Sequence, residues 1–430
     1  VFSHTGDDSV YFNKYGRYGG LGAYQSQESP YYGWYTFLEY PERYRCWWGF
    51  DTLPEVNEER QDWIDFVIEG EGSVFNTWVR RGAAGFRLDV ADELPDDTIE
   101  RMRRALKAAD PEAFLLGEVW EDATTKQSYN VGRRYALGGG LDSVMNYPFA
   151  NYTAGFLLGR IDAFAYMRFL VSQSQNYPKE MYYALMNLLS SHDIARIRTV
   201  LAGGVDGKGM SREEQAGFTV SAEDDARGEA LVRCAAALQY SLPGIPVIYY
   251  GDEAGLHGLL DPFNRGTLPV EVFGDASDDS LAGWYRSLGA LRSAHRALRT
   301  GDALYYSTHG YVIGILRYCL GGRDAFGAPA ADEMLFTVVN PDPEPRRIVI
   351  DLRAEKECLS MENLALIRAV EPRRAVRLLP GCGGDASLSP QDAVQPEATC
   401  SAYDRQIVPI TSGLLDISIP PRCVEIFEIV

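Results

Sequence analysis

Residues 82–93 read Gly-Ala-Ala-Gly-Phe-Arg-Leu-Asp-Val-Ala-Asp-Glu, a short apolar run that opens with glycine and closes with acids. A helix-like pattern follows from Asp96 to Ala109. Together these features predict a buried strand with charge at its carboxyl end. Alternate residues of a strand share a face, so Arg87 and Asp89 should point the same way. We expect them to pair, because an unpaired buried charge is costly.

Two other segments repeat this pattern of an apolar strand that ends in an acid. Residues 114–120, Phe-Leu-Leu-Gly-Glu-Val-Trp, carry Glu118, and residues 185–193, Leu-Met-Asn-Leu-Leu-Ser-Ser-His-Asp, end in His192 and Asp193. Helical patterns separate the three segments, which favours parallel strands. In a (β/α) barrel, the carboxyl ends of such strands build the functional site. Three unrelated structural ion pairs would be a coincidence, so the acids predict one site.

The motifs resemble signature regions of the α-amylase family of retaining glycosidases. The matching stretches are Gly-Phe-Arg-Leu-Asp-Val-Ala-Asp-Glu (85–93), Gly-Glu-Val-Trp-Glu-Asp (117–122), Ser-Ser-His-Asp (190–193), Val-Phe-Ser-His (1–4) and Leu-Pro-Glu-Val-Asn (53–57). Residues 245–253 and 261–265 are similar to the closing strand and following loop of the neopullulanase and cyclomaltodextrinase branch. The resemblance covers about residues 1–297.

This resemblance implies a role for each matched side chain. Asp89 would be the nucleophile, Glu118 the general acid and base, and Asp193 the carboxylate that holds the hydroxyls of a distorted sugar. Arg87 would keep Asp89 ionised, and Trp120 would help shield Glu118 from water. The residues implied to bind substrate are His4, Arg87, Glu93, Trp120, His192, Asp261 and Arg265. Asp252 and Glu253, which end another strand, are expected to be structural instead.

The implied activity is retaining hydrolysis of α-1,4-glucosidic bonds, and of α-1,6 bonds as a further option, in maltooligosaccharides, cyclodextrins or pullulan. Two alternatives stay open. One is a transglycosylase on the same fold, and the other is a catalytically silent carbohydrate-binding or partner subunit. The presence of all three acids and Arg87 argues against the silent subunit. A homodimer of the full-length protein is compatible with the resemblance.

The implied fold is a (β/α)8 TIM barrel over residues 1–297, followed by an antiparallel β-sandwich over residues 298–430. After the end of one strand near residue 1, we find strand patterns at 84–90, 114–120, 141–147, 184–191 and 245–251. We therefore expect the first two barrel strands and most of the third to precede this chain. Residues 5–57 would be a subdomain inserted after the third strand, and most of its many aromatic rings should form its own small core.

Composition excludes several classes of protein. The 430 residues, 46% of them hydrophobic, can form two or three domains. A formal charge of −19 argues against nucleic-acid and anionic-membrane surfaces. No apolar run approaches the roughly 20 residues of a membrane span. The seven scattered cysteines favour free thiols in a reducing compartment, which fits a cytoplasmic location.

No cofactor is expected from the sequence, and its cysteines lack metal-ligand spacing. Many relatives of the family hold calcium with an Asn just before the histidine that corresponds to His4. Ser3 stands at that position here, which argues against a calcium site.

Overall fold

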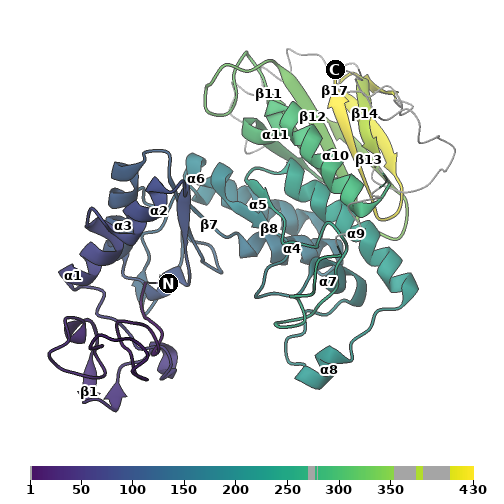
Figure 1. Cartoon of the computed structure of the whole chain (residues 1–430). Coiled ribbons are helices and arrows are strands. Elements are labelled where there is room, and N and C mark those ends of the chain that lie inside the picture. The colour runs from purple at the N-terminus through teal and green to yellow at the C-terminus, as the bar shows by residue number, and fades with distance from the viewer. Residues whose placement is uncertain (1, 270–276, 278, 353–373, 381–406) are drawn as a thin grey trace. The chain divides into compact units, whose positions relative to one another are not determined.

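The computed structural model describes residues 2–269, 277, 279–352, 374–380 and 407–430. The chain forms two compact units, Val1–Met145 and Asn146–Val430 (Figure 1). Parallel strands that end in acids occur in both units. Each unit is therefore described on its own.

The first part of the N-terminal unit is a loop-rich segment with two short strands, β1 (Phe37–Glu39) and β2 (Arg43–Tyr44), and the turns η1 (Tyr32–Trp34) and η2 (Trp47–Gly49). Phe12 is fully buried and contacts the rings of Tyr35 and Tyr44 edge-on, with centroids 4.9 and 4.7 Å away. Such edge-to-face pairs stabilise a small core beyond the area that they bury. The rings thus largely pack on one another, as the sequence predicted.

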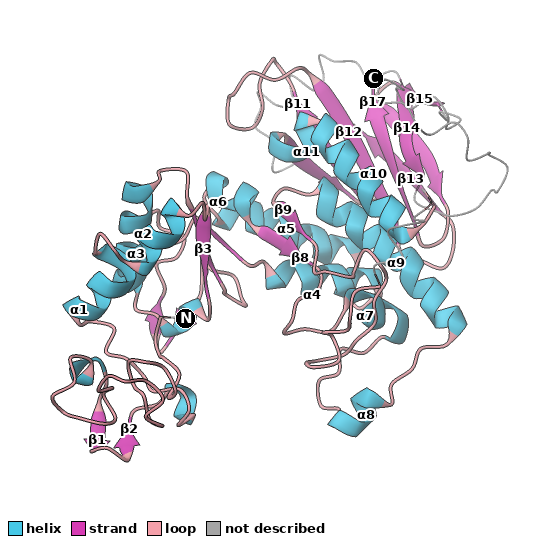
Figure 2. Ribbon diagram, in the orientation of Figure 1, coloured by secondary structure: helices cyan, strands magenta, loops and turns pink. Residues whose placement is uncertain are grey.

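The rest of this unit is built on three parallel strands in the order β3 (Gly85–Leu88), β4 (Phe114–Gly117) and β7 (Ser143–Val144). Gly85 permits this pairing, because a Cβ there would lie 2.0 Å from the carbonyl oxygen of Phe114. The helices α1 (Gln61–Ile64), α2 (Val74–Arg80) and α3 (Asp96–Ala109) belong to this unit (Figure 2). Its other elements are η3 (Asp65–Glu69), η4 (Ala91–Glu93), β5 (Gln127–Ser128) and β6 (Val131–Gly132).

Helix α3 matches its predicted bounds because its sequence signals are complete. Two acids, Asp96 and Asp97, occupy its first turn, where they complement the helix dipole. Ile99, Met102 and Leu106 recur at helical spacing, and all three side chains are buried. This helix connects β3 to β4, so the two strands are parallel neighbours and their carboxyl ends meet.

The C-terminal unit starts with helices around a parallel pair, β8 (Met186–Leu188) and β9 (Ile245–Val247). Its helices are α4 (Tyr147–Leu157), α5 (Ala163–Asn176), α6 (Lys179–Ala184), α7 (Ile197–Gly203), α8 (Arg212–Ala216), α9 (Ala222–Ser241), α10 (Leu281–Ala294) and α11 (Arg296–Thr300). A buried cluster joins these helices to the following strands, since Leu238 of α9 shares it with Ile315 and Ile426.

The same unit ends in an antiparallel sheet of eight strands in the order β10-β11-β12-β17-β14-β15-β16-β13. The strands are β10 (Asp302–Tyr306), β11 (Ile313–Cys319), β12 (Glu333–Asn340), β13 (Arg346–Asp351), β14 (Arg374–Pro380), β15 (Ile407–Thr411), β16 (Leu414–Ile419) and β17 (Cys423–Ile429). Alternate residues of β13 and β16, such as Ile348 and Ile417, share one core with Phe336 of β12. The predicted antiparallel C-terminal sheet is therefore present.

Three sequence expectations need correction or fall outside the described residues. The stretch 203–227, whose mixture of Gly, Asp, Glu and Ser predicts a mobile surface excursion, contains α8 with a complete capping box at Ser211 and Glu214, and the start of α9. Cys46, Cys234 and Cys319 have free thiols, whereas Cys423 is disulfide-bonded, so the free-thiol prediction is wrong for Cys423. The segment 354–404, in which the sequence shows no regular strand pattern, contains β14, and its Cys358, Cys382 and Cys400 lie outside the described residues. Among the described helices, none is long and apolar enough to cross a membrane.

Candidate active site

A single guanidinium group connects the two acids of the N-terminal unit. The register pairs Leu88 with Gly117, so Asp89 and Glu118 directly follow neighbouring strand ends. Arg87 Nη1 lies 3.0 Å from Asp89 Oδ1, and its Nη2 lies 2.9 Å from Glu118 Oε2. The predicted Arg87–Asp89 pair is thus present, although both side chains are about a third exposed rather than buried, at 32% and 38%.

Glu118 is much less accessible than Asp89. Only 5% of it is exposed, and its Oε2 also accepts a hydrogen bond of 2.9 Å from the backbone N–H of Val90. Trp120 donates its indole N–H to Glu118 Oε1 at 3.3 Å, while 41% of Trp120 itself remains exposed. Trp120 therefore contacts Glu118 as expected, but as a hydrogen-bond donor at the edge of the site rather than as a buried shield.

The backbone at Val90 is strained in a way that serves this contact. Val90 has φ 42° and ψ 63°, the left-handed region, which is a rare conformation for a β-branched residue. Such a conformation costs about 1–3 kcal/mol and persists only where neighbours enforce it. Here Ala91 N–H donates to the Glu118 carbonyl at 3.2 Å, and Glu118 N–H donates to the Leu88 carbonyl at 2.9 Å. The strain thus directs the Val90 N–H at the Glu118 carboxylate.

His4 is part of a column of stacked rings. Its ring lies 5.0 Å from that of Trp47, which in turn stacks on Trp48 at 4.1 Å. Burial lowers the pKa of His4, and the nearby Asp89 carboxylate acts in the opposite direction. Trp48 ends the column and is 60% exposed. The column therefore extends from the neighbourhood of Asp89 to a solvent-accessible aromatic ring.

A cavity of about 630 Å³ lies beside this column, within the size range of small-ligand sites. It is lined by Ser3, Thr36, Arg45, Trp47, Trp48, Glu55, Val56, Asn57, Glu58, Glu59, Glu93, Pro95 and Tyr129. Burial, together with Glu55, Glu93 and Glu59, raises the pKa of Glu58 to about 7. Glu93 accepts a hydrogen bond of 2.6 Å from the Tyr129 hydroxyl, which raises the pKa of Tyr129 to about 12. The wall is rich in oxygen acceptors and aromatic surface.

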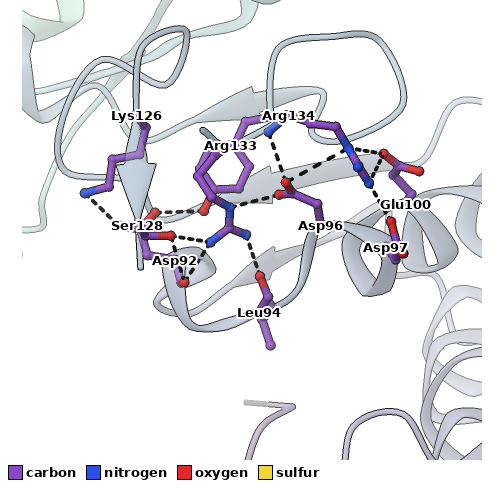
Figure 3. Close-up of polar contacts among 10 residues, drawn as sticks. Asp92, Leu94, Asp96, Asp97, Glu100, Lys126, Ser128, Arg133 and Arg134 are labelled. Carbon is purple, nitrogen blue, oxygen red and sulfur yellow. Dashed lines mark hydrogen bonds and ion pairs between the residues drawn. The ribbon is translucent and has the colours of Figure 1, made fainter. Parts of the chain in front are cut away.

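A buried arginine fastens the loop after β4 to the loop after β3 (Figure 3). Arg133 is 6% exposed and pairs with Asp96 at 2.9 Å. It also donates to the Asp92 carbonyl and to the Ser128 hydroxyl, both at 2.7 Å. Lys126 adds an ion pair of 2.9 Å to the Asp92 carboxylate. These contacts hold the turn that carries Glu93 against the loop that carries Tyr129.

The remaining predicted site residues lie in the C-terminal unit. His192 and Asp193 form the turn after β8, and His192 Nε2 lies 3.0 Å from Asp193 Oδ2. Both side chains remain accessible, at 38% and 31%. Asp261 and Arg265 form an exposed ion pair of 2.7 Å in the loop after β9. Asp193 therefore lies beside His192 in the C-terminal unit, and Asp89 lies near Glu118 in the N-terminal unit.

Asp252 has the structural environment that the sequence analysis expected. It is only 3% exposed, and its Oδ1 lies 3.1 Å from Nη1 of the fully buried Arg196. Burial raises the pKa of Asp252 to about 7. The Arg196 guanidinium also lies against the rings of Tyr249 and Tyr250, at 4.5 and 4.9 Å. This pair binds the loop after β9 to the loop after β8.

Within the described part of the chain, no group of three His, Cys, Asp or Glu side chains is arranged to hold a metal ion. Ser3, where relatives would have the calcium-binding Asn, is 9% exposed and lines the cavity described above. We therefore assign no step to calcium, and the sequence expectation about calcium stays a prediction.

Sequence reasoning missed several contacts of the site. It assigned no role to Met145, whose sulfur lies 3.2 Å from Arg87 Nε, nor to Tyr129 and Arg133. It noted Trp47 and Trp48 only as members of the aromatic segment. The adjacent pair of tryptophans was the one available signal, because Trp combines a large apolar face with a polar N–H and is enriched at interfaces. The other contacts join loops far apart in sequence and leave no local pattern.

Comparison with known proteins places these residues in context. A model of the α-amylase catalytic domain family matches residues 1–279. An amylopullulanase of Thermoanaerobacterium thermosulfurigenes is 32% identical over 455 aligned positions, which cover 97% of this chain and 23% of that protein. A cyclomaltodextrinase of Bacillus sp is 33% identical over 251 positions, covering 58% of this chain and 38% of that protein. The chain spans only 23–28% of the length of the amylopullulanases that it matches.

Solved structures of other proteins have the same fold as this chain. The Thermus thermophilus protein Ttha1563 superposes with a TM-score of 0.69 at 26% identity, over 100% of this chain and 76% of that one. A debranching enzyme of Nostoc punctiforme also gives a TM-score of 0.69, at 23% identity, over 99% of this chain and 74% of that one.

Proposed function

Because the chain belongs to the α-amylase family, we propose that it is the catalytic part of a retaining glycosidase that cleaves α-glucosidic bonds. The observation that carries the proposal is the Arg87 guanidinium, which holds Asp89 and Glu118 together at adjacent strand ends. A retaining mechanism needs two carboxyl groups close to one anomeric carbon. One of them must be accessible for attack, and Asp89 is the more exposed of the two.

The proposed reaction proceeds by two displacements. In the first, a carboxylate oxygen of Asp89 bonds to the anomeric carbon while the glycosidic C–O bond breaks and Glu118 gives its proton to the leaving oxygen. In the second, Glu118 takes a proton from water, the water oxygen bonds to the anomeric carbon, and the Asp89–carbon bond breaks. Each displacement inverts the anomeric centre, so the product keeps the α configuration.

Each surrounding group has a proposed part in these steps. Arg87 contacts both carboxyl groups and orients Asp89 for attack on the anomeric carbon. Its bond to Glu118, with that of the Val90 N–H, holds the second carboxyl in place through proton transfer. His192 and Asp193 would bind sugar hydroxyls, and these contacts accelerate the reaction to the extent that they strengthen in the transition state.

The proposed substrate is an α-glucan oligosaccharide. The similar proteins named above include an amylopullulanase and a cyclomaltodextrinase, and a neopullulanase of Thermoactinomyces vulgaris is 27% identical over 70% of this chain. The cavity beside the Trp47–Trp48 stack suits such a ligand, because aromatic faces pack against the C–H faces of sugar rings while carboxylates accept hydroxyl hydrogen bonds. We propose Trp48 as the ring on which a distal sugar stacks.

Within this proposal, the parallel strands β3, β4, β7, β8 and β9 serve as strands four to eight of the family's barrel. The loop-rich residues 5–57 then form the insertion after strand three, and residues 298–430 form the C-terminal sandwich domain. A homodimer of the full-length protein remains part of the proposal.

The test is to replace Asp89 by Asn in the full-length protein and follow cyclodextrin, pullulan and maltotriose as substrates. We expect kcat to fall more than about a thousandfold while maltotriose still binds, because a neutral amide cannot act as the nucleophile. Asp97→Asn is the matched control, since this acid is 86% exposed at the start of α3. Activity of the Asp89→Asn variant within a few-fold of wild type would remove Asp89 from the nucleophile role. The product ratios also separate hydrolysis from transglycosylation.

A further inference from the structure

The loop after β9 carries a buried amide that contacts the turn containing Asp193. Asn264 is fully buried, and its Nδ2 lies 3.1 Å from the Ser191 carbonyl oxygen, 2.9 Å from that of His192 and 2.9 Å from that of Ile194. The orientation of the amide group follows from this arrangement. A flipped amide would place its oxygen against three carbonyl oxygens.

The three carbonyls belong to a tight turn that presents His192 and Asp193. Ser191 and Ile194 pair with each other across the turn, and the Asp193 N–H donates to the Ser191 hydroxyl at 3.1 Å. The carbonyl oxygens on the inner side of this turn need donors, because buried carbonyls without partners are costly. Asn264 supplies them from a neighbouring loop. The backbone of the turn is therefore set by a side chain outside it.

Asn264 is itself held rigidly. The fully buried Arg196 donates through Nε to the Asn264 carbonyl at 2.9 Å, and through Nη1 to the Tyr250 carbonyl at 2.7 Å. Gly258 allows the loop to close on itself, since a Cβ there would lie 2.2 Å from the Phe263 carbonyl oxygen and 2.7 Å from Asn264 Cα. Arg196 and the tight loop thus fix the amide in one place.

We propose that Asn264 is a positioning residue that sets the place of the Asp193 carboxylate through the backbone of the 191–194 turn. The inference rests on the proposed function, in which Asp193 binds the sugar. Side chains 31–38% exposed have few neighbours to orient them, so the placement of His192 and Asp193 depends on the turn beneath them. Misplacement of a substrate-binding group by about 1 Å can cost on the order of a hundredfold in rate.

The chain offers a closely matched control for this inference. Asn340, in the C-terminal sheet, is also fully buried, and its Nδ2 also faces three carbonyls, those of Glu344, Ile419 and Pro420, at 3.0, 3.2 and 2.8 Å. We expect Asn264→Ala to lower kcat/KM by about ten- to a hundredfold at a temperature where it is fully folded. Asn340→Ala should lower the melting temperature as much as Asn264→Ala does, because both remove a buried amide that bonds three carbonyls. It should nevertheless leave kcat/KM within about twofold of wild type.

A double-mutant cycle with Asp193→Asn tests whether Asn264 acts through Asp193. If it does, Asn264→Ala should lower kcat/KM by less than about threefold in the Asp193→Asn background, because residues that act as a unit are not additive. An equal loss in both backgrounds would show that Asn264 acts by another route and would overturn the proposal. So would an Asn264→Ala enzyme with unchanged kcat/KM.

Should Asn264→Ala fail to fold, Asn264→Ser keeps one donor at the same site and takes its place in the cycle. The expected pattern is the same, with a smaller loss in the wild-type background, and additivity with Asp193→Asn would again overturn the proposal. The activity of the Asp193→Asn single variant tests the proposed role of Asp193 separately from the positioning role of Asn264. If it is fully active, the proposed role of Asp193 fails, whereas a large loss in Asp193→Asn with none in Asn264→Ala refutes only the positioning role.

Discussion

The carboxyl ends of β3 and β4 and those of β8 and β9 both present acids, but they hold them by different means. At the first pair, an arginine that is about a third exposed contacts the acid side chains directly. At the second pair, Arg196 is fully buried and contacts backbone carbonyls and Asp252, while Asn264 supports the turn of Asp193. We therefore expect the accessible Arg87 to contribute to the rate of the reaction and the buried Arg196 to contribute to the stability of the fold.

The largest expected effect comes from removing the accessible arginine. Arg87→Ala should lower kcat/KM by about a hundred- to a thousandfold, because Asp89 and Glu118 lose their shared positive charge. Arg87→Lys should recover little, since an ammonium cannot span two carboxylates as a guanidinium does. Steady-state kinetics on maltotriose measure this, with Arg101→Ala as the control, because Arg101 pairs with Glu69 outside the site. Full activity in Arg87→Ala would show that Arg87 is not needed for the reaction and would contradict the distinction drawn between Arg87 and Arg196.

The buried arginine should give the opposite result. Arg196→Met should lower the free energy of unfolding by about 3–5 kcal/mol, because it leaves Asp252 and the Asn264 and Tyr250 carbonyls without their partner. Chemical denaturation of the Arg196→Met and Arg87→Met variants, measured side by side, compares the two positions. We expect a smaller loss for Arg87→Met, because Asp89 is 38% exposed and Glu118 keeps its hydrogen bonds from the Val90 N–H and Trp120. Equal losses would show that exposure does not separate the two roles.

A smaller effect should appear in the pH dependence of stability. The folded-state pKa of Glu58 is raised from 4.5 to about 7 by burial and neighbouring acids, so the folded chain binds this proton more tightly than the unfolded chain. Its contribution to stability is therefore present below about pH 4.5 and is lost as the pH rises toward 7. Glu58→Gln should flatten this decline by about 1–2 kcal/mol. Denaturation at pH 5 and pH 8 measures it, and Glu39→Gln, which is 70% exposed, should change nothing.

The smallest expected effect concerns the exposed ring of the stacked column. Trp48→Ala should raise KM by about three- to tenfold for long maltooligosaccharides and leave kcat on maltotriose nearly unchanged, since stacking contributes about 1 kcal/mol. Trp78→Ala is a suitable control, because this tryptophan is 51% exposed and lies on α2, outside the residues that line the cavity. A kcat loss on short and long substrates alike would place Trp48 in the reaction rather than in distal binding.

The sequence predicted what depends on local pattern. Apolar runs and the helix signals of residues 96–109 located β3, β4, β8, β9 and α3, and the motifs indicated the acids at the strand ends. It overestimated strand lengths, because β3 stops at Leu88, where the chain enters the left-handed turn at Val90. A β-branched residue gives no hint of that conformation.

The contacts that organise the site could not be found in this way. The bond from Arg87 to Glu118 depends on the pairing of Leu88 with Gly117, and the bond from Asn264 to Ser191 joins loops 73 positions apart. Neither is encoded by a periodicity, because each depends on how separate elements meet. An isolated Asn or Arg in a loop has the same local sequence whether it is buried or exposed.

The most direct test of the central claim is to trap the covalent intermediate on the full-length protein. A fluorinated α-glucosyl fluoride forms the glycosyl-enzyme but slows its hydrolysis, so the labelled protein can be digested and sequenced by mass spectrometry. The account predicts one added sugar on the peptide that contains Asp89, and no label in the Asp89→Asn variant. A label on Glu118, or first release of the β-anomer from an α-1,4-linked substrate, would contradict it.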